Sequence, residues 1–394
     1  MEPIGKSLCK SEYGGLSLSL YDNLDYVKPL WQKFEETALL TPFQTTSWLY
    51  QWHCHIGTLE QVKPLVVVVE DGAGPLIILP LQIEKGVLRK LSWLGSDLND
   101  YNCPLIAQDY WARAKGLSTV DIWRQVLVLI NAQAGFQHDY IRLEKMPDQI
   151  CGQANPMIAL GTKLGASHAY RTQMEGNFDE FYTSKRSSKS KSKDRYSRRK
   201  LAELGNLSMV CPDEVLGIRG VVDTLIEQKS ARFEQMGVEN FFQKPGYMDF
   251  YRAVAAEQRD LIHVSELRVG DKTAAANFGL TFRGAYYYVL TSYAQGETSR
   301  FSPGTVHLLD VMKLFIEKGF NAFDFTIGDE PYKVEWCDGK NALYDHMDAS
   351  TMQGRAALAY WQAFQSTKRY IKQTPSLWNA YSKLRSVLGA RKAG

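Results

Sequence analysis

Residues 285–333 read AYYYVLTSYAQGETSRFSPGTVHLLDVMKLFIEKGFNAFDFTIGDEPYK, and this stretch decides the fold. Its alternation and turn residues predict a strand over 285–293, a Ser302-Pro303-Gly304 turn that opens a helix over 306–318, and a strand over 322–327. About four free backbone N–H groups and the helix dipole make such a helix start favourable for an anion. The stretch therefore predicts an α/β unit with an anion-binding turn between two strands.

The segments around this stretch occur twice along the chain in the same order. In the second half, helices are expected over 178–204, 214–237 and 247–257, followed by strands over 263–269 and 273–282. In the first half we expect a strand over 16–21, helices over 26–36 and 47–53, strands over 64–70, 76–84 and 87–94, a helix over 117–135 and a strand over 140–143. The order predicts two copies of one α/β unit with mixed sheets.

The domain limits follow from the connecting segments. Residues 147–156, with Gly152 and Asn155, form the expected connector, and the tail over 357–391 predicts two helices split near Pro375. We therefore expect a first domain over 1–155, a second over 156–356 and a helical tail over 357–394.

Composition places few restrictions on function but argues for a cytoplasmic protein. The chain has 394 residues, 45% of them hydrophobic and 23% charged, and a net charge of only +3. The N-terminus lacks the apolar region of a signal peptide, and no apolar run approaches the length of a membrane span. The six cysteines are scattered without CxxC spacing, which favours reduced thiols. His53-Cys54-His55 is the only local cluster of soft ligands, and adjacent residues rarely share one ion, so no metal site is expected.

Residues 185–200, KRSSKSKSKDRYSRRK, form a strongly basic run. Nine Lys/Arg residues against Asp194 give +8, which leaves −5 for the rest of a chain whose total is +3. Such a run suits nucleic acid, an anionic lipid surface or a phosphorylated substrate. Tyr196 is its one aromatic residue, which weakens the case for a base-stacking platform. We favour the interpretation that the run forms the basic face of a helix that lies above a ligand channel.

The Ser302-Pro303-Gly304 turn is the candidate cofactor site. Ser at the N-cap and Pro at the first helical position are a standard helix start, so a merely well-capped helix is the competing interpretation. Gly304 lacks a side chain where a ligand would approach, and Arg300 lies just upstream to pair with a phosphate. Thr305 and Val306 would contribute further backbone N–H groups.

The strand over 322–327 and the residues after it carry the candidate acid/base groups. Alternation places Asp324 opposite Phe323 and Phe325, and an Asp in an aromatic strand is disfavoured unless it is paired or lines a cleft. A desolvated carboxylate suits a general base near neutrality, whereas a carboxylate tied to a buried cation or N–H is structural. Glu330, Tyr332 and Lys333 follow the strand. They are suited to act as a base, a proton donor and an anion-binding group, respectively. The competing interpretation is a solvated turn.

Two further regions are candidates for substrate binding. The polar loop over 95–104 carries Asp100 and Tyr101, which are suited to hydroxyls or an amine, although Asx-rich turns have the same composition. Arg232 lies on the helix over 214–237, where an exposed position is the competing interpretation. There is no GxGxxG, Walker A or GxSxG motif, so hydride transfer, nucleotide hydrolysis and serine hydrolysis have no support.

Four motifs together resemble the CelD-like (BioF2-like) acetyltransferase family, a group within the GCN5-related N-acetyltransferase (GNAT) superfamily with a FemAB-like tandem layout. They are LSWLGSDLNDYNCPLI (91–106), RSSKSKSKDRYSRRKLAELG (186–205), RFSPGTVHLL (300–309) and FDFTIGDEPYK (323–333). The resemblance covers most of residues 15–355. The superfamily loop usually has Arg/Gln-x-x-Gly-x-Gly/Ala, whereas this chain has Arg300-Phe-Ser-Pro303-Gly304-Thr305, in which Pro303 lacks an N–H.

The resemblance implies two tandem GNAT domains, an acyl-CoA donor and a role in cellulose or other exopolysaccharide synthesis. On that basis we expect acyl transfer to an amine or hydroxyl of a sugar or amino-acid-like precursor. We expect the second domain to bind acyl-CoA and the first domain to bind no cofactor. A backbone N–H near Leu290–Ser292 would stabilise the oxyanion, Asp324 or Glu330 would act as base and Tyr332 would protonate the thiolate. Lys333 would hold an acceptor phosphate or carboxylate.

Two other interpretations remain open. One is a FemAB-like transferase that takes its aminoacyl group from tRNA, for which the basic run is the best support. The other is a non-catalytic module that binds a nucleotide or polysaccharide precursor and regulates a synthase. The expected partners are a small, lipid-linked or nucleotide-linked sugar substrate and peripheral contact with a membrane polysaccharide synthase, with nucleic acid only under the tRNA interpretation.

Overall fold

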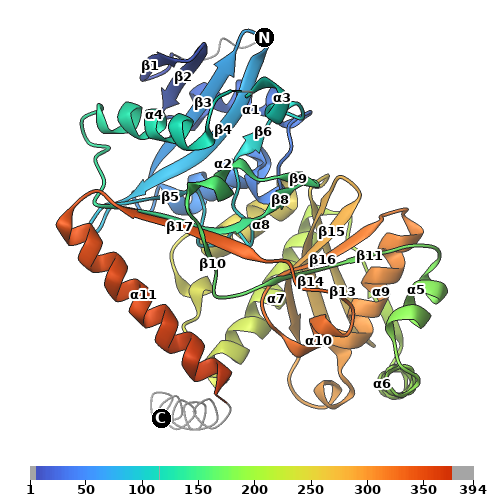
Figure 1. The fold of residues 1–394 in the computed structure, drawn as a ribbon. Helices are drawn as coiled ribbons and strands as arrows, with labels where there is room; N and C mark the ends of the chain where they lie inside the picture. Colours follow the sequence, from blue (N-terminus) through green and yellow to red (C-terminus); the bar gives the residue numbers. More distant parts are fainter. Residues whose placement is uncertain (1–5, 115, 375–394) are drawn as a thin grey trace. The chain divides into compact units, whose positions relative to one another are not determined.

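The chain folds into two compact units (Figure 1), in a computed structural model that describes residues 6–114 and 116–374. The first unit contains the chain up to His168 together with Ala342–Arg369, and the second contains Ala169–Asn341 and the described residues 370–374. These limits differ from the predicted boundaries at 155 and 356, chiefly because the chain returns to the first unit after Asn341.

The first unit is built on one mixed sheet with the strand order β1-β2-β3-β4-β5-β7-β17-β10, and β6 pairs with β4. Among the described strands of this sheet, β5 and β7 are parallel neighbours and the other pairs are antiparallel. The strands are β1 (Cys9–Tyr13), β2 (Leu16–Tyr21), β3 (Lys63–Asp71), β4 (Gly74–Glu84), β5 (Lys90–Trp93), β6 (Leu105–Ile106), β7 (Tyr140–Pro147), β10 (Lys163–Leu164) and β17 (Leu343–Ala349). The helices are α1 (Leu24–Glu35), α2 (Thr46–Trp52), α3 (Tyr110–Arg113), α4 (Thr119–Asn131) and α11 (Met352–Gln373).

The second unit also contains one mixed sheet, in the order β11-β16-β15-β14-β13-β12. Here β15 and β16 are the parallel neighbours. The strands are β11 (Ala169–Gln173), β12 (Leu207–Val210), β13 (Ile262–Val269), β14 (Lys272–Phe282), β15 (Ala285–Tyr293) and β16 (Ala322–Ile327). The helices are α5 (Phe178–Lys185), α6 (Ser188–Leu204), α7 (Val215–Gln235), α8 (Tyr247–Glu257), α9 (Pro303–Glu317) and α10 (Pro331–Val334).

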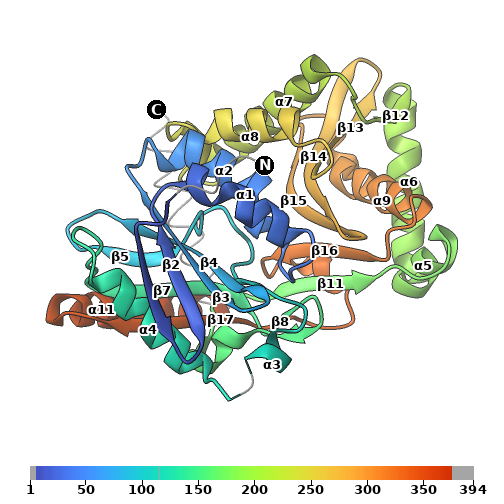
Figure 2. The same ribbon diagram turned by 90° about the horizontal axis from the view of Figure 1, so that it is seen from above.

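The helices of the second unit cover both faces of its sheet. α7 and α8 pack on one face and α9 on the other (Figure 2). On the α9 side, Tyr286 and Tyr288 join Phe323 and Phe325 in one buried aromatic core with residues of the helix such as Phe315. This alternation fixes the opposite face for Asp324.

The two units repeat one pattern, as the sequence predicts. Each contains an antiparallel meander, then a helix, then a strand that pairs in parallel with the last strand of the meander: β3-β4-β5, α4 and β7 in the first unit, and β13-β14-β15, α9 and β16 in the second. The predicted α/β class with mixed sheets is thereby confirmed. β17, which no sequence pattern predicted as part of the first unit, lies between β7 and β10.

Two helix predictions need correction. The single helix expected over 178–204 is two helices, α5 and α6, because the chain is extended at Arg186 (φ −113°, ψ 126°), where its guanidinium forms a buried ion pair with Asp194. The predicted tail helix begins earlier than expected, at Met352, and the predicted second tail helix lies outside the described residues.

Candidate functional site

β15 and β16 diverge partway along their length. Their parallel pairing runs from Ala285 and Ala322 only as far as Tyr287 and Asp324. β15 continues to Tyr293 and β16 to Ile327, so the remainder of each strand pairs no further with the other. We call this region the divergent edge. Backbone N–H and C=O groups along such an edge are oriented to meet an extended ligand.

A β-bulge lies within the diverging part of β15. Phe278 of β14 pairs with Leu290, but the next residue, Gly279, pairs with Tyr288, so Val289 has no partner in the ladder. The amide of Asn277 also donates to the carbonyl of Leu290 at 3.0 Å. A bulge re-aims the local backbone, and this one lies one residue beyond Tyr288.

The start of α9 follows β15 but differs from the predicted helix cap. Ser302 occupies the N-cap position in a left-handed conformation (φ 49°), and its side chain caps no N–H. Its carbonyl instead accepts from the N–H groups of Thr305 at 3.0 Å and Val306 at 3.3 Å. Pro303 has no N–H, so Gly304 alone retains an N–H without an acceptor at this helix start in the described chain. The expected cradle of four or more free amides is therefore smaller than predicted.

Cationic side chains surround this helix start. The guanidinium of Arg232 lies 5.0 Å from the centre of the Tyr293 ring and donates to the phenol oxygen, and Lys229 donates to the Thr291 carbonyl at 3.3 Å. The Tyr293 ring lies 3.9 Å from the position of a Cβ on Gly304. Arg300 is exposed just upstream. Positive side chains and a helix dipole together favour an anion here.

Ser292 and Leu290, both expected near the cofactor, are engaged by neighbouring side chains. The Ser292 hydroxyl donates to Gln228 of α7 at 2.8 Å, and the Leu290 carbonyl accepts from Asn277. Their contacts hold the diverging strand against α7 and β14. The predicted cofactor residues on β15 and α9 and the predicted substrate residue Arg232 thus meet at one end of the second unit.

Asp324 lies at the point where the divergence begins. Its side chain is almost fully buried, and its Oδ1 accepts from the N–H of Thr326 at 2.8 Å. Thr326 has a left-handed backbone (φ 58°), which this hydrogen bond supports. Burial, and then the nearby Asp324 carboxylate, raise the pKa of the Cys337 thiol to about 12. The carboxylate therefore has a structural contact as well as a position at the candidate site.

The residues after β16 form a compact ionic turn. The buried ammonium of Lys333 lies 2.9 Å from both the Ile327 carbonyl and the half-exposed Glu330 carboxylate. This pairing turns the Lys333 amine inward, away from an acceptor held in solution. Burial raises the pKa of the Tyr332 phenol well above its usual range, with Tyr288 and Glu330 adding to the effect. Tyr332 therefore remains protonated near neutral pH.

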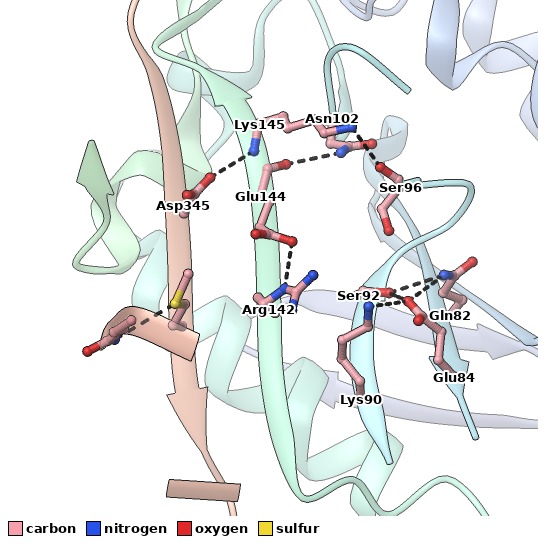
Figure 3. A network of polar contacts seen from close by, with 12 residues as sticks. Gln82, Glu84, Lys90, Ser92, Ser96, Asn102, Arg142, Glu144, Lys145 and Asp345 are labelled. Atoms are coloured by element: carbon pink, nitrogen blue, oxygen red, sulfur yellow. Dashed lines mark hydrogen bonds and ion pairs between the residues drawn. The ribbon is translucent and has the colours of Figure 1, made fainter. Parts of the chain in front are cut away.

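The corresponding edge in the first unit is filled by its own chain (Figure 3). β5 and β7 pair only as far as Ser92 and Arg142. Beyond that point, residues of the loop over 95–102 form hydrogen bonds with β7. Asn102 donates from its backbone to the Lys145 carbonyl and from its side chain to the Glu144 carbonyl, both at 3.0 Å. Lys145 Nζ donates in turn to the carbonyls of Ser96 at 3.0 Å and Asn99 at 2.7 Å.

The predicted substrate residues of the first unit belong to this loop. Tyr101 is buried, and its carbonyl accepts from Gln44 at 2.8 Å. Asp100 is partly exposed. The sequence did not predict the contacts of Tyr293 and Lys145 or the bulge at Val289. A tyrosine ending a strand is a weak signal, and nothing local marks the bulge or the lysine that binds the loop.

Among the residues that the structure describes, no group of three or more His, Cys, Asp or Glu side chains has the arrangement of a metal site. In the same part of the chain, no helix combines the length and apolar character needed to cross a bilayer.

Comparison with known proteins identifies the second unit. Residues 188–334 match the family model described as an acetyltransferase (GNAT) domain, so this unit contains a GNAT-type acetyltransferase domain. Comparison with curated proteins gives no match. Among solved structures, FemX shows a TM-score of 0.55 at 11% identity and covers 86% of this chain and 97% of its own. A conserved protein of unknown function from Bacteroides thetaiotaomicron shows a TM-score of 0.52 at 12% identity, and the match covers 83% of this chain and 98% of that protein. A tandem GNAT protein from the clavulanic acid biosynthesis pathway shows a TM-score of 0.44 at 11% identity, and the match covers 84% of this chain and 98% of that protein.

Proposed function

We propose that the second unit transfers an acyl group, acetyl in the simplest case, from acyl-CoA to an amine or hydroxyl of a sugar or amino-acid-like precursor. The observation that carries the proposal is the divergence of β15 from β16 at Tyr287 and Asp324, with the start of α9 following β15 after the short connecting segment 294–302. This arrangement provides an extended edge for an acyl-pantetheine arm and, next to it, a site for its phosphates.

The donor phosphates would bind at the start of α9. The free N–H of Gly304 and the positive end of the helix supply one side of the site. Arg232 supplies a guanidinium, which forms strong charge-assisted hydrogen bonds with phosphate oxygens. Because Pro303 and the Ser302 carbonyl remove amide donors, side-chain cations carry more of the binding than free amides do.

The acyl thioester would lie along the divergent edge next to the Val289 bulge. There a backbone N–H of the Val289–Leu290 segment would donate to the oxygen that becomes negative when the carbonyl is attacked. Such donors contribute because they are already oriented before the reaction begins. Thioesters are activated, so holding donor and acceptor together supplies much of the rate.

The acceptor must lose a proton as it attacks the carbonyl carbon. Asp324 is the base in our proposal because it lies where the strands part, whereas Glu330 is already paired with Lys333. The acceptor nitrogen or oxygen forms the new bond to the acyl carbon while its proton passes to the carboxylate. The carbon–sulfur bond then breaks, and the thiolate takes a proton, for which Tyr332 is our candidate donor. Free CoA and the acylated acceptor result.

The donor site lies in the second unit only in this proposal. The loop over 95–102 and Lys145 occupy the corresponding edge of the first unit. Hydrogen bonds between them and the neighbouring backbone already engage the carbonyl groups there. The CelD-like affiliation and a place in exopolysaccharide synthesis in the cytoplasm belong to the proposal as well, and rest on the sequence motifs.

Acetyl-CoA binding tests the proposal directly. Thermal unfolding should shift upward with acetyl-CoA, by about 2.7 kcal/mol of stability at one hundred times Kd. Arg232→Ala should weaken binding roughly 10- to 100-fold, since a hydrogen bond to a charged group contributes about 1.5–3 kcal/mol.

Arg219→Ala is the matched control, because Arg219 is an exposed arginine on the same helix. Equal binding by the two variants would remove Arg232 from the donor site. No shift with any acyl-CoA would reject the proposed donor.

A second candidate donor is aminoacyl-tRNA, for which the basic run over 185–200 is the support. Salt-sensitive binding of aminoacyl-tRNA, without any effect of CoA on thermal unfolding, would select it.

A further inference from the structure

Helix α6 carries most of the basic run, and the structure divides its cations into two groups. Five of the nine cations in residues 185–200 pair with carboxylates. Lys185 pairs with Asp338, Arg186 with Asp194 and Glu335, Arg198 with Asp310, and both Arg199 and Lys200 with Glu203. The pairs with Asp338, Glu335 and Asp310 link this segment to other elements of the unit, whereas Glu203 belongs to α6 itself.

The remaining four cations are Lys189, Lys191, Lys193 and Arg195. Within the described part of the chain none of them forms an ion pair or hydrogen bond with a side chain. Lys189, Lys193 and Arg195 are exposed and Lys191 is partly so. Four like charges within two helical turns repel one another, so the folded protein maintains this cluster without internal compensation.

The four cations lie on both flanks of α6. Asp194, Ser197 and Leu201 are its buried residues and mark the side that packs on the unit. Residues two apart on a helix differ by about 200°, so Lys189 and Lys193 lie on one flank and Lys191 and Arg195 on the other. Ser192 and the half-exposed Tyr196 lie between the flanks on the outer side.

We propose that this outer side of α6 is a docking surface for an anionic membrane leaflet. A flat layer of negative headgroups below the helix reaches both flanks at once, because long Lys and Arg side chains bend toward it. A single nucleic-acid strand follows one flank and leaves the other pair unused. Tyr196, with an apolar ring and a polar hydroxyl, is suited to the headgroup region.

This surface adjoins the proposed donor site. α6 packs against α9 and against the short 3-10 helix η5 (Thr298–Phe301) that precedes it. The rings of Tyr196 and Phe301 meet edge to face, with their centres 6.4 Å apart, and Arg198 pairs with Asp310 of α9. Docking through α6 would therefore place the start of α9 near the lipid headgroups, where a membrane-borne acceptor would be found.

Vesicle co-sedimentation tests the surface without any acyl donor. The full chain should bind vesicles of phosphatidylcholine mixed with phosphatidylglycerol, should not bind pure phosphatidylcholine, and should dissociate at high salt. Lys189→Gln/Lys193→Gln and Lys191→Gln/Arg195→Gln should each weaken binding about 30-fold, since each cation near an anionic leaflet contributes about 1 kcal/mol.

Lys272→Gln/Lys340→Gln is the matched control, because both lysines are exposed in the same unit and lie outside α6. It should bind vesicles as the unchanged protein does. Circular dichroism and thermal unfolding of each variant should remain unchanged, since all four substituted positions on α6 lack partners.

Three results would overturn the proposal: no binding to the mixed vesicles, dependence on one flank alone, or equal loss in the control. Duplex RNA is tested in parallel. RNA binding that one flank alone supports, together with absent vesicle binding, would assign the surface to nucleic acid instead. The inference does not depend on the proposed function, since the acetyl-CoA shift of the α6 variants should equal that of the unchanged protein.

Discussion

At the scale of single residues, the proposed mechanism depends on Asp324, whose carboxylate both accepts from the Thr326 N–H and lies where β15 and β16 part. Asp324→Asn keeps an oxygen acceptor for the Thr326 N–H but cannot take a proton. We expect kcat with acetyl-CoA to fall by roughly 10²-fold or more, the usual contribution of a general base, while thermal stability changes little. Steady-state kinetics and thermal unfolding check both parts.

Glu330→Gln provides the comparison for Asp324. Glu330 is half-exposed and paired with Lys333, so its loss should affect turnover far less than the loss of Asp324. Unchanged turnover in Asp324→Asn, or a larger loss in Glu330→Gln, would transfer the role of base to Glu330.

At the scale of secondary-structure elements, a substitution at the start of α9 should affect ligand binding without destabilising the fold. The position of a Cβ on Gly304 meets only the Tyr293 ring, at the ordinary distance of 3.9 Å. Gly304→Ala should therefore leave the free energy of unfolding unchanged or raise it by up to about 1 kcal/mol, as for Gly to Ala in helices. The added methyl group occupies the approach to the free N–H, so acetyl-CoA should bind less tightly. Calorimetric titration that finds unchanged affinity would exclude this helix start as the phosphate site.

The junction between α5 and α6 depends on one buried ion pair. Arg186 contacts Asp194 through two hydrogen bonds of 3.1 and 2.9 Å, and Tyr182 donates to the same carboxylate at 3.0 Å. Asp194→Ala would leave the buried guanidinium with only its ion pair to the half-exposed Glu335, and should destabilise the protein by up to about 3–5 kcal/mol. Removal of the exposed Arg199–Glu203 pair by Glu203→Ala should cost less than about 1 kcal/mol. Urea unfolding of the two variants compares these values, and similar losses would contradict the structural role of Arg186.

At the scale of the whole molecule, buried histidines set the response to acid. Burial lowers the pKa of both His263 and His307 from 6.5 to about 3, so the folded protein keeps them neutral. Below pH 6.5 the unfolded chain binds protons that the folded chain does not, and stability should fall as the pH decreases toward 3. Each histidine contributes up to about 1.4 kcal/mol per pH unit in this window.

Asp345 in the first unit acts in the opposite direction over a narrower window. Burial raises its pKa from 3.8 to about 6, so the folded state binds its proton more readily between these values. The two histidine shifts are larger together, and net acid destabilisation is therefore expected. Thermal unfolding of the protein and of His307→Gln between pH 7 and 4 measures the slope, which should be shallower in the variant. Equal slopes would show that His307 does not contribute.

Sequence periodicity was sufficient for the repeated strands and helices, because these patterns are local. The meander and α9 in particular correspond closely to the predicted segments. It was insufficient for the backbone of Ser302, whose left-handed conformation depends on the surrounding turn, and for the break at Arg186, which depends on Asp194. The pairing of β17 with β7, across about two hundred residues, has no local signal at all.

The insertion of β17 between β7 and β10 also determines the order in which the polypeptide can mature. During synthesis, the sheet of the first unit cannot be completed until the ribosome has made residues 343–349, which form β17. All strands of the second unit's sheet lie within segment 169–341 and are therefore available earlier. Until then the nascent edges of β7 and β10 are open to chaperones or to improper partners. A fragment that stops at residue 168 should therefore aggregate, and a split protein should require its C-terminal piece to rescue the N-terminal one.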